Sequence, residues 1–416
     1  MKKQLATNPP LATNLCIPDV EAHVWEDGRL YLYGSYDIAG KENWCSGIHH
    51  VYSTDDMLTW VDHGVAFSVD DIKWTQADTL YAPECAFYKG MYYLYYCLPG
   101  GQCGVAKSDK PYGPFEDLGQ IEGVDGIDPA VLVDDDGQPY LYWGQFDNVR
   151  VAKLRDNMKE IIPETVTQPL SVAEHEFHEG ASVRKWNGRY YFVFTDTHRH
   201  GNMATSQGYA VSDNPMSGFV YKNVLIDNFG CDPGTWNNHG SIECFKGQWY
   251  MFYHRATHNG SWSRQLWIEP LQMDKNGDFA EVKMTSSGAA WTLPATETIM
   301  GCQACEVTGG ACIAADADSA HDFALCAIRD GSTATWRYIA FGGENRFSVK
   351  MKTGAVGRVE LYLDGWYRET MKVTECDGYT VFTAPVAALR GTHTVELKFF
   401  GRFENAVLDE LTFFEA

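Results

Sequence analysis

The sequence lacks any apolar run close to the ~20 residues that a membrane-spanning helix needs, and it is poor in basic side chains. Its 33 lysines and arginines stand against 55 aspartates and glutamates, which gives a formal net charge of −22. A surface of this sign repels nucleic acid and anionic lipid. With 45% hydrophobic and 14% aromatic residues, the composition is otherwise globular. We therefore expect no nucleic-acid partner, no membrane partner, and a neutral or cationic ligand.

The twelve cysteines lack the spacing of a disulfide framework. Cys302 and Cys305 form one CxxC pair, but no second pair stands at zinc-ribbon spacing. Reduced, mostly buried thiols are therefore expected. The first 16 residues contain two lysines without an apolar segment behind them, which is not the pattern of a secretory signal. Both features predict a cytoplasmic protein, or a secreted one if a leader has been removed.

Five short aromatic strands recur in the first 290 residues, and each follows a turn that contains glycine. Hairpins that repeat every 50 residues or so, as they do here, are typical of propeller blades. Each unit is too small to bury its own faces, so five units are expected to stack around an axis. A β-sandwich with many hairpins is the alternative, but it does not explain the shared period. We predict an all-β protein whose residues 1–295 form a five-bladed β-propeller. The five strands are LYLYGSYD, MYYLYYC, PYLYWGQFD, RYYFVFTDTH and QWYMFYHRATH.

Four polar residues keep nearly one offset from the turn glycines. Asp19, Asp128 and Glu179 each precede their glycine by nine residues, and His239 precedes its glycine by eight. The first strand of each blade lines the propeller axis, so these side chains are expected to meet at one mouth of the channel. Carboxylates brought together have divergent pKa values, which keeps one acid protonated beside one ionised base. An inverting glycosidase needs such a pair about 6.5–9.5 Å apart, with room for a water molecule.

Three segments resemble, in the right order, the catalytic segments of glycoside hydrolase family 43. They are CIPDVEAHVWEDGRLYLYGSYD, GIDPAVLVDDDGQPYLYWG and FHEGASVRKWNGRYYFVFTD. The resemblance implies that Asp19 is the general base that activates water and that Glu179 is the general acid. It also implies that Asp128 orients this acid and tunes its pKa. The match departs after Asp19, where Val20 and Glu21 replace the usual proline and small residue.

Other positions enter as candidate substrate or metal contacts. NNHGSIECFKGQWYMFYH is similar to the family segment whose histidine lies at the axis near a calcium ion or water, which implies that role for His239. Calcium prefers oxygen ligands, and a hydrogen-bonded channel histidine is the alternative. Arg264 in SWSRQLWIEPL matches an arginine near the sugar and the base, with a structural ion pair as the alternative. Five aromatic residues on loops or strand ends are candidates for stacking on sugar faces, namely Trp44, Trp74, Tyr81, Trp143 and Trp236. Since most tryptophans of a propeller belong to the blade core, only Trp74 and Trp143 are favoured.

After residue 295 the aromatic period stops, and short alternating strands with glycine turns follow. This pattern predicts a β-sandwich of the jelly-roll type over residues 296–416. The segments VELYLDG and THTVELKFFGRFENAVLDELTFFE resemble a family 6 carbohydrate-binding module. The resemblance implies that Trp336, Trp366 and Asn405 contact sugar. A purely structural appendage is the alternative.

The family resemblance implies an exo-acting, inverting glycosidase. Its expected partners are plant cell-wall oligosaccharides such as arabinoxylan and arabinan, from which it would remove α-L-arabinofuranosyl or β-D-xylosyl residues. A fructan-cleaving propeller hydrolase would use Glu84 beside Cys85 as its acid, but this pair precedes Asp128, which is the wrong order. A galactoside substrate and a sugar-binding propeller without catalysis are further alternatives. The sequence does not predict the oligomeric state.

Overall fold

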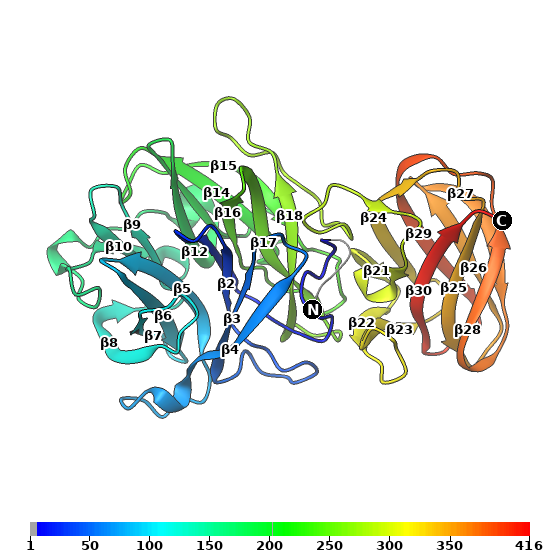
Figure 1. Ribbon diagram of the computed structural model, residues 1–416, viewed down its shortest axis with the longest axis horizontal. Coiled ribbons are helices and arrows are strands. Elements are labelled where there is room, and N and C mark those ends of the chain that lie inside the picture. The colour runs from blue at the N-terminus through cyan, green and yellow to red at the C-terminus, as the bar shows by residue number, and fades with distance from the viewer. Residues whose placement is uncertain (1–5, 202) are drawn as a thin grey trace.

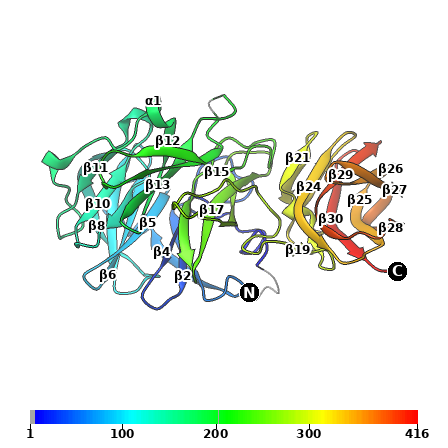
Figure 2. The same cartoon turned by 90° about the horizontal axis from the view of Figure 1, so that it is seen from above.

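The computed structural model describes residues 6–201 and 203–416. Figure 1 shows two parts side by side along the long axis, and Figure 2 shows the same separation from above. Within the described residues, the first part holds five small antiparallel sheets and the second part holds two sheets of six strands each. The predicted all-β architecture is confirmed.

Each of the five small sheets is built from one continuous stretch of chain. Their strands, sheet by sheet, are β1 (Glu21–Val24), β2 (Leu30–Gly34), β3 (Ile48–Thr54) and β4 (Trp60–Ser68); β5 (Tyr81–Tyr88), β6 (Met91–Leu98), β7 (Gln102–Ser108) and β8 (Glu116–Asp125); β9 (Ala130–Val133), β10 (Pro139–Trp143) and β11 (Arg150–Lys153); β12 (Phe177–Trp186), β13 (Arg189–Asp196), β14 (Ser206–Ser212) and β15 (Val220–Asp227); and β16 (Ser241–Phe245), β17 (Gln248–Thr257) and β18 (Ser263–Leu271). The aromatic strands of the sequence repeat are the second strands: β2, β6, β10, β13 and β17.

The first strands of the five sheets form a closed ring. β1 contacts β5, β5 contacts β9, β9 contacts β12, β12 contacts β16, and β16 returns to β1. The turn glycine before each second strand has a left-handed backbone, with φ between 75° and 85°, a conformation that glycine adopts without steric cost. The sheets are therefore the blades of a five-bladed propeller, and the predicted repeat marks one hairpin in each blade.

The N-terminal segment runs beside the last blade. The Asn8 side chain exchanges two hydrogen bonds with the backbone of Ile268 in β18, of 2.9 and 3.0 Å. Gln265, also in β18, donates to the carbonyl of Thr13 at 2.6 Å. The ring thus closes between its first and last blades with the help of residues that precede the first blade.

Helices play almost no part in this architecture. The described chain contains one short α-helix, α1 (Val172–His175), and the 3-10 turns at 69–71, 146–148, 163–165 and 301–303. Among the described residues, no helix has the length and apolar character needed to cross a membrane.

The second part is a β-sandwich. One of its sheets contains β19 (Leu293–Pro294), β24 (Thr333–Phe341), β29 (Gly391–Gly401), β26 (Gly357–Leu363) and β27 (Trp366–Val373), with β21 (Glu306–Thr308) paired to β24. The other contains β22 (Cys312–Ala315), β23 (Phe323–Ile328), β30 (Ala406–Phe414), β25 (Arg346–Thr353) and β28 (Cys376–Pro385), with β20 (Ile299–Met300) paired to β30. The predicted sandwich is confirmed, and the predicted domain boundary after residue 295 lies just past β19. That boundary stays a prediction.

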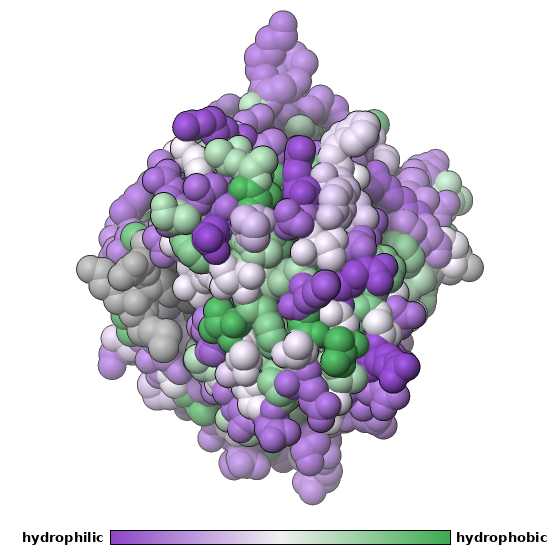
Figure 3. All heavy atoms as spheres, turned by 90° about the vertical axis from the view of Figure 1, so that its right-hand side faces the viewer, coloured by the Kyte–Doolittle hydropathy of each residue, from purple (hydrophilic) through white to green (hydrophobic). Residues whose placement is uncertain are grey.

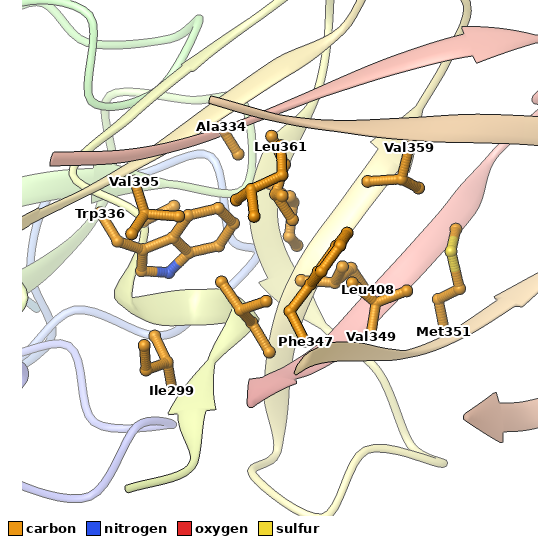
Figure 4. Close-up of a cluster of buried hydrophobic side chains, with 14 of the residues drawn as sticks. Ile299, Ala334, Trp336, Phe347, Val349, Met351, Val359, Leu361, Val395 and Leu408 are labelled. Carbon is orange, nitrogen blue, oxygen red and sulfur yellow. The ribbon is translucent and has the colours of Figure 1, made fainter. Parts of the chain in front are cut away.

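Large apolar side chains fill the space between the two sheets of the sandwich. Figure 4 shows Trp336 and Phe347 among aliphatic side chains from both sheets. The Trp336 side chain is fully buried, and its Nε1 donates to the carbonyl of Met300 at 3.1 Å. The prediction that Trp336 contacts sugar is wrong, because the alternation along β24 turns this side chain into the core.

The outer face of the sandwich is mixed in character. Figure 3 looks at the end of the molecule remote from the propeller, where small groups of hydrophobic side chains lie among hydrophilic ones. Trp366 is 73% exposed, and Tyr367 beside it is 51% exposed. Both stand at the hairpin that joins β26 to β27.

Candidate active site

The predicted polar residues meet in one pocket at a mouth of the propeller channel. The cavity has a volume of about 220 Å³. Its walls include the residues predicted as catalytic and two of the predicted contacts, namely Asp19, Asp128, Glu179, His239 and Arg264. Blades one, three, four and five supply these side chains.

The local backbone explains why the offset from the turn glycines carries information. Asp19, Asp128 and His239 each lie two residues before the first strand of their blade. Asp19 and Asp128 share a left-handed backbone, with φ of 56° and 55°, which aspartate tolerates better than most residues. Glu179 differs because it lies inside β12, between two irregularities of the pairing with β13. Bulges of this kind re-aim side chains next to active sites.

Asp19 lies in a cationic environment. Arg264 Nη1 donates to Asp19 Oδ1 at 2.7 Å. The Nδ1 atoms of His239 and His254 lie 3.7 and 3.6 Å from the same oxygen. Burial is the strongest single influence on this carboxyl group and opposes its ionisation, but Arg264, His239 and His254 together outweigh burial, and the pKa of Asp19 is lowered. Asp19 is therefore ionised and able to accept a proton.

A second aspartate holds Arg264 in place. Asp37 accepts hydrogen bonds from Nε and Nη2 of Arg264 at 2.9 Å each, and from its backbone N–H at 3.0 Å. The two side chains are buried. This bidentate pairing fixes the plane of the guanidinium and leaves Nη1 directed at Asp19. Sequence reasoning missed Asp37, although it closes the aromatic stretch LYLYGSYD.

Asp128 and Glu179 face a different environment. Burial raises the pKa of Asp128 well above its usual range, and the negative charges of Glu179 and Asp19 add to this effect. Asp128 Oδ2 accepts a hydrogen bond from the backbone N–H of Gly180 at 3.0 Å. Glu179 Oε2 accepts one from Gln145 Nε2 at 2.6 Å. The pKa values of Asp19 and Asp128 are therefore shifted in opposite directions.

Aromatic side chains form the rim, but they are not the two that the sequence favoured. Trp44 and Trp236 line the pocket, with ring centroids 6.3 Å apart. The Arg264 guanidinium lies over the Trp44 ring at 4.8 Å, a favourable cation–π distance. The predictions for Trp74 and Trp143 are wrong. Trp143 is buried in the core between blades two and three. Trp74 lies outside the lining, where its Nε1 donates to Asp117 at 3.2 Å.

The comparisons with known proteins agree with this geometry. The model of "Glycosyl hydrolases family 43" matches residues 7–279. The chain belongs to glycosyl hydrolase family 43. It is therefore a glycosidase, and the matched residues cover the whole propeller apart from its extreme ends.

Several characterised relatives of this family 43 chain are similar over most of its length. A xylosidase/arabinosidase of Thermoclostridium stercorarium is 33% identical over 334 residues, which cover 70% of this chain and 69% of the relative. An arabinoxylan arabinofuranohydrolase of Paenibacillus polymyxa is 29% identical, over 90% of this chain and 69% of the relative.

Solved structures show the same likeness. A family 43 β-xylosidase/α-arabinofuranosidase from a compost microbial metagenome, in complex with xylotriose and described as a calcium-free form, has a TM-score of 0.60 at 28% identity. It covers 68% of this chain and 99% of its own. An arabinoxylan arabinofuranohydrolase from Bacillus subtilis shares the fold over 100% of this chain and 99% of its own, with a TM-score of 0.59 at 23% identity.

The surroundings of His239 do not form a calcium site by themselves. The nearest carboxylate oxygens belong to Asp19 and Asp128, at 3.7 and 4.0 Å from Nδ1, and Asp19 is already bound to Arg264. Calcium takes six to eight oxygen ligands, whereas only two carboxylates of the described residues lie within 4.0 Å of His239 Nδ1 in this family 43 pocket. Burial lowers the pKa of His239, so a neutral imidazole faces Asp19.

A buried polar cluster lies further along the channel of this family 43 propeller. Glu21, His23 and Glu84 place three possible ligand atoms within 4.8 Å of one another. A guanidinium already occupies this region, because Arg184 Nη2 donates to Glu21 at 2.7 Å and Arg184 Nε lies 3.4 Å from Glu243. Its positive charge disfavours a divalent ion at this cluster. Glu84 belongs to this cluster, whereas Ala82, two residues before it, lines the pocket.

Proposed function

We propose that the protein is an inverting, exo-acting glycosidase that removes α-L-arabinofuranosyl or β-D-xylosyl residues from arabinoxylan-type oligosaccharides. The names of its relatives support this substrate class. The observation that carries the mechanism is the pairing of an arginine-bound Asp19 with Glu179 in one pocket. One aspartate kept ionised and one glutamate on another blade are the two carboxyl groups that such hydrolysis requires.

In this proposal, Asp19 is the general base. A water molecule held by its free oxygen attacks the anomeric carbon, and Asp19 takes the proton of that water. The bond between the anomeric carbon and the leaving oxygen breaks as Glu179 donates its proton to that oxygen. The products are one free sugar, with inverted configuration, and a shortened oligosaccharide.

Asp128 acts as a positioning residue for the acid. It accepts a hydrogen bond from the backbone N–H of Gly180, the neighbour of Glu179. This contact ties the irregular part of β12 to blade three. Gln145 fixes the Glu179 carboxyl from the other side at 2.6 Å. Preorganised support of this kind holds a catalytic group within reach of the reacting atoms.

The size of the pocket supports exo action. A cavity of about 220 Å³ is smaller than the roughly 300–1,000 Å³ of sites that enclose drug-sized ligands, and it suits one sugar ring. Trp44 and Trp236 stand at its edge, with Trp236 43% exposed. The remainder of the oligosaccharide then lies outside the pocket, across this rim.

The first test compares the wild type with Glu179→Ala and Asp19→Asn on aryl α-L-arabinofuranoside, aryl β-D-xyloside and an arabinoxylan oligosaccharide. Loss of the acid lowers kcat/KM most for the oligosaccharide, because an activated aryl group leaves without protonation. Loss of the base lowers kcat/KM by the same factor for both kinds of substrate. We expect the ratio of kcat/KM for the aryl glycosides to kcat/KM for the oligosaccharide to change by ~10²-fold or more in Glu179→Ala and to stay constant in Asp19→Asn. Equal losses in both variants would contradict these roles, and an inactive wild type would contradict the substrate class.

Sugar binding by the sandwich is a separate proposal. The exposed pair Trp366 and Tyr367 favours it, since exposed aromatic rings stack on sugars. Asn405 is also exposed. Binding of soluble xylan by the wild type but not by Trp366→Ala, measured by affinity electrophoresis, is the expected result.

A further inference from the structure

The propeller and the sandwich exchange side chains across their junction. Cys16, which precedes blade one, is buried in the hydrophobic core of the sandwich. Cys305, which belongs to the sandwich segment, is buried in the core between the last two blades. Arg255 in β17 is fully buried and donates to the carbonyl of Ala304. Each core is therefore completed by the other part of the chain.

One chain of contacts leads from the sandwich core to Arg264. The Asp37 backbone N–H donates to the carbonyl of Cys16 at 2.9 Å, in an isolated antiparallel bridge. Ala39, two residues on, packs against the same sandwich core. Asp37 is the side chain that holds the Arg264 guanidinium with two hydrogen bonds. The position of Asp37 thus depends on a strand segment whose neighbour, Cys16, is anchored in the sandwich.

A second chain of contacts reaches the backbone of Arg264. The hairpin between β17 and β18 carries His258, whose backbone N–H donates to the carbonyl of Ile313 at 2.6 Å. His258 Nε2 accepts from the backbone N–H of Ala315 at 3.1 Å, and its ring lies 4.8 Å from Phe323. All three partners belong to the sandwich. At the other end of this hairpin, Arg264 is the second residue of β18.

We propose that the sandwich is a positioning element of the active site, which holds Arg264 against Asp19 through Cys16 and Asp37 on one side and His258 on the other. This inference rests on the proposed function, since Arg264 matters through the base that it contacts. It assigns to the sandwich a task in the reaction, in addition to any sugar binding on its exposed face.

The test uses two full-length histidine variants. His258→Ala removes a ring whose partners join the hairpin to the sandwich. His393→Ala is the matched control, because His393 also makes two side-chain hydrogen bonds, to Asp364 at 2.6 Å and to the carbonyl of Arg390 at 2.7 Å, but entirely within the sandwich. We expect kcat on an aryl pentoside to fall by ~10-fold in His258→Ala, since small misplacements of catalytic groups carry costs of this order, with KM little changed. His393→Ala should keep the wild-type kcat.

Hydrogen exchange supplies a readout that does not depend on activity. The amides of Asp37 and Cys45 are bonded to Cys16 and to the Asp37 carboxylate, respectively, and both should exchange faster in His258→Ala than in His393→Ala. Exchange and kcat in His258→Ala that match the control would overturn the proposal. If the wild type cleaves no pentoside, the proposed function fails, and the exchange rates still decide whether the sandwich positions this segment.

Discussion

At the scale of single residues, the site is organised by one guanidinium shared between two aspartates. Asp37 accepts hydrogen bonds from Nε and Nη2 of Arg264, and Asp19 accepts one from Nη1. The charge that favours ionisation of Asp19, the proposed base, is itself held by a second carboxylate, Asp37. Trp44 covers one face of the guanidinium at 4.8 Å, which shields this network from water and so strengthens it.

The network predicts how activity depends on pH. The pKa of Asp19 is lowered in the folded protein, because burial, the largest single influence, is outweighed by Arg264 acting together with His239 and His254. A base works above its pKa, so activity is lost as the pH falls through that value. Arg264→Gln removes the favourable charge, and we expect the acidic limb of the kcat/KM profile to move to higher pH.

The profile of Arg189→Gln is the control for this shift. Arg189 lies at the start of β13, where it donates to the carbonyl of Asn276, so the variant loses the same charge without touching the pocket. An acidic limb that stays in place in Arg264→Gln, or that moves equally in Arg189→Gln, contradicts the assignment of Asp19 as base.

The residues that line the pocket were easier to predict from the sequence than the residues that hold them in place. Asp19, Asp128 and His239 were predictable because each precedes a first strand by the same two residues. Asp37 and Gln145 were missed, although each follows a second strand by two or three residues. Antiparallel pairing brings the end of a second strand beside the start of the first, so polar residues there share the same mouth of the channel.

At the scale of elements, alternation along strands decides which aromatic rings are available to a ligand. The sandwich offers a matched pair of tryptophans. Trp336 is fully buried in β24, and Trp366 is 73% exposed at the start of β27. Composition and glycine turns predicted the strands, but the prediction for Trp336 did not use the alternation along β24, whose buried residues Ala334, Trp336, Ile339 and Phe341 are all apolar.

Replacing each of these two tryptophans by alanine is expected to change stability by very different amounts. Trp336→Ala leaves a cavity and an unpaired Met300 carbonyl, so we expect a loss of about 3–5 kcal/mol in the free energy of unfolding. Trp366→Ala should change it by no more than about 0.5 kcal/mol, as is usual for exposed positions. Urea unfolding followed by intrinsic fluorescence measures both. Comparable losses in the two variants would show that the exposure of Trp366 is not maintained in solution.

At the scale of the whole molecule, the two parts are more closely joined than the sequence suggested. A change of repeat after residue 295 predicted separate domains, which by default move relative to one another. The exchange of Cys16 and Cys305 between the two cores could not be read from the sequence, because no pattern around either residue indicates which distant segment it packs against. Contacts between distant segments are set by shape and not by local pattern.

The interlocked cores predict cooperative unfolding. We expect one transition in differential scanning calorimetry, with the calorimetric and van't Hoff enthalpies in agreement. Replacing Cys305 by a bulkier Met should lower the midpoint of this transition while keeping it single, because overpacking in one core is felt by both. Two separated transitions in the wild type would contradict an interlocked junction.

The closure of the ring has a consequence for how the molecule is made. Asn8 and Thr13 find their partners on β18, some 250 residues later in the chain, so a ribosome must release the last blade before the beginning of the chain can be seated. Asp19 and Arg264, which stand on opposite sides of this seam, meet only at that moment. The pocket of a nascent chain is therefore incomplete until nearly the whole propeller has been synthesised, and it forms only when the first and last blades come together.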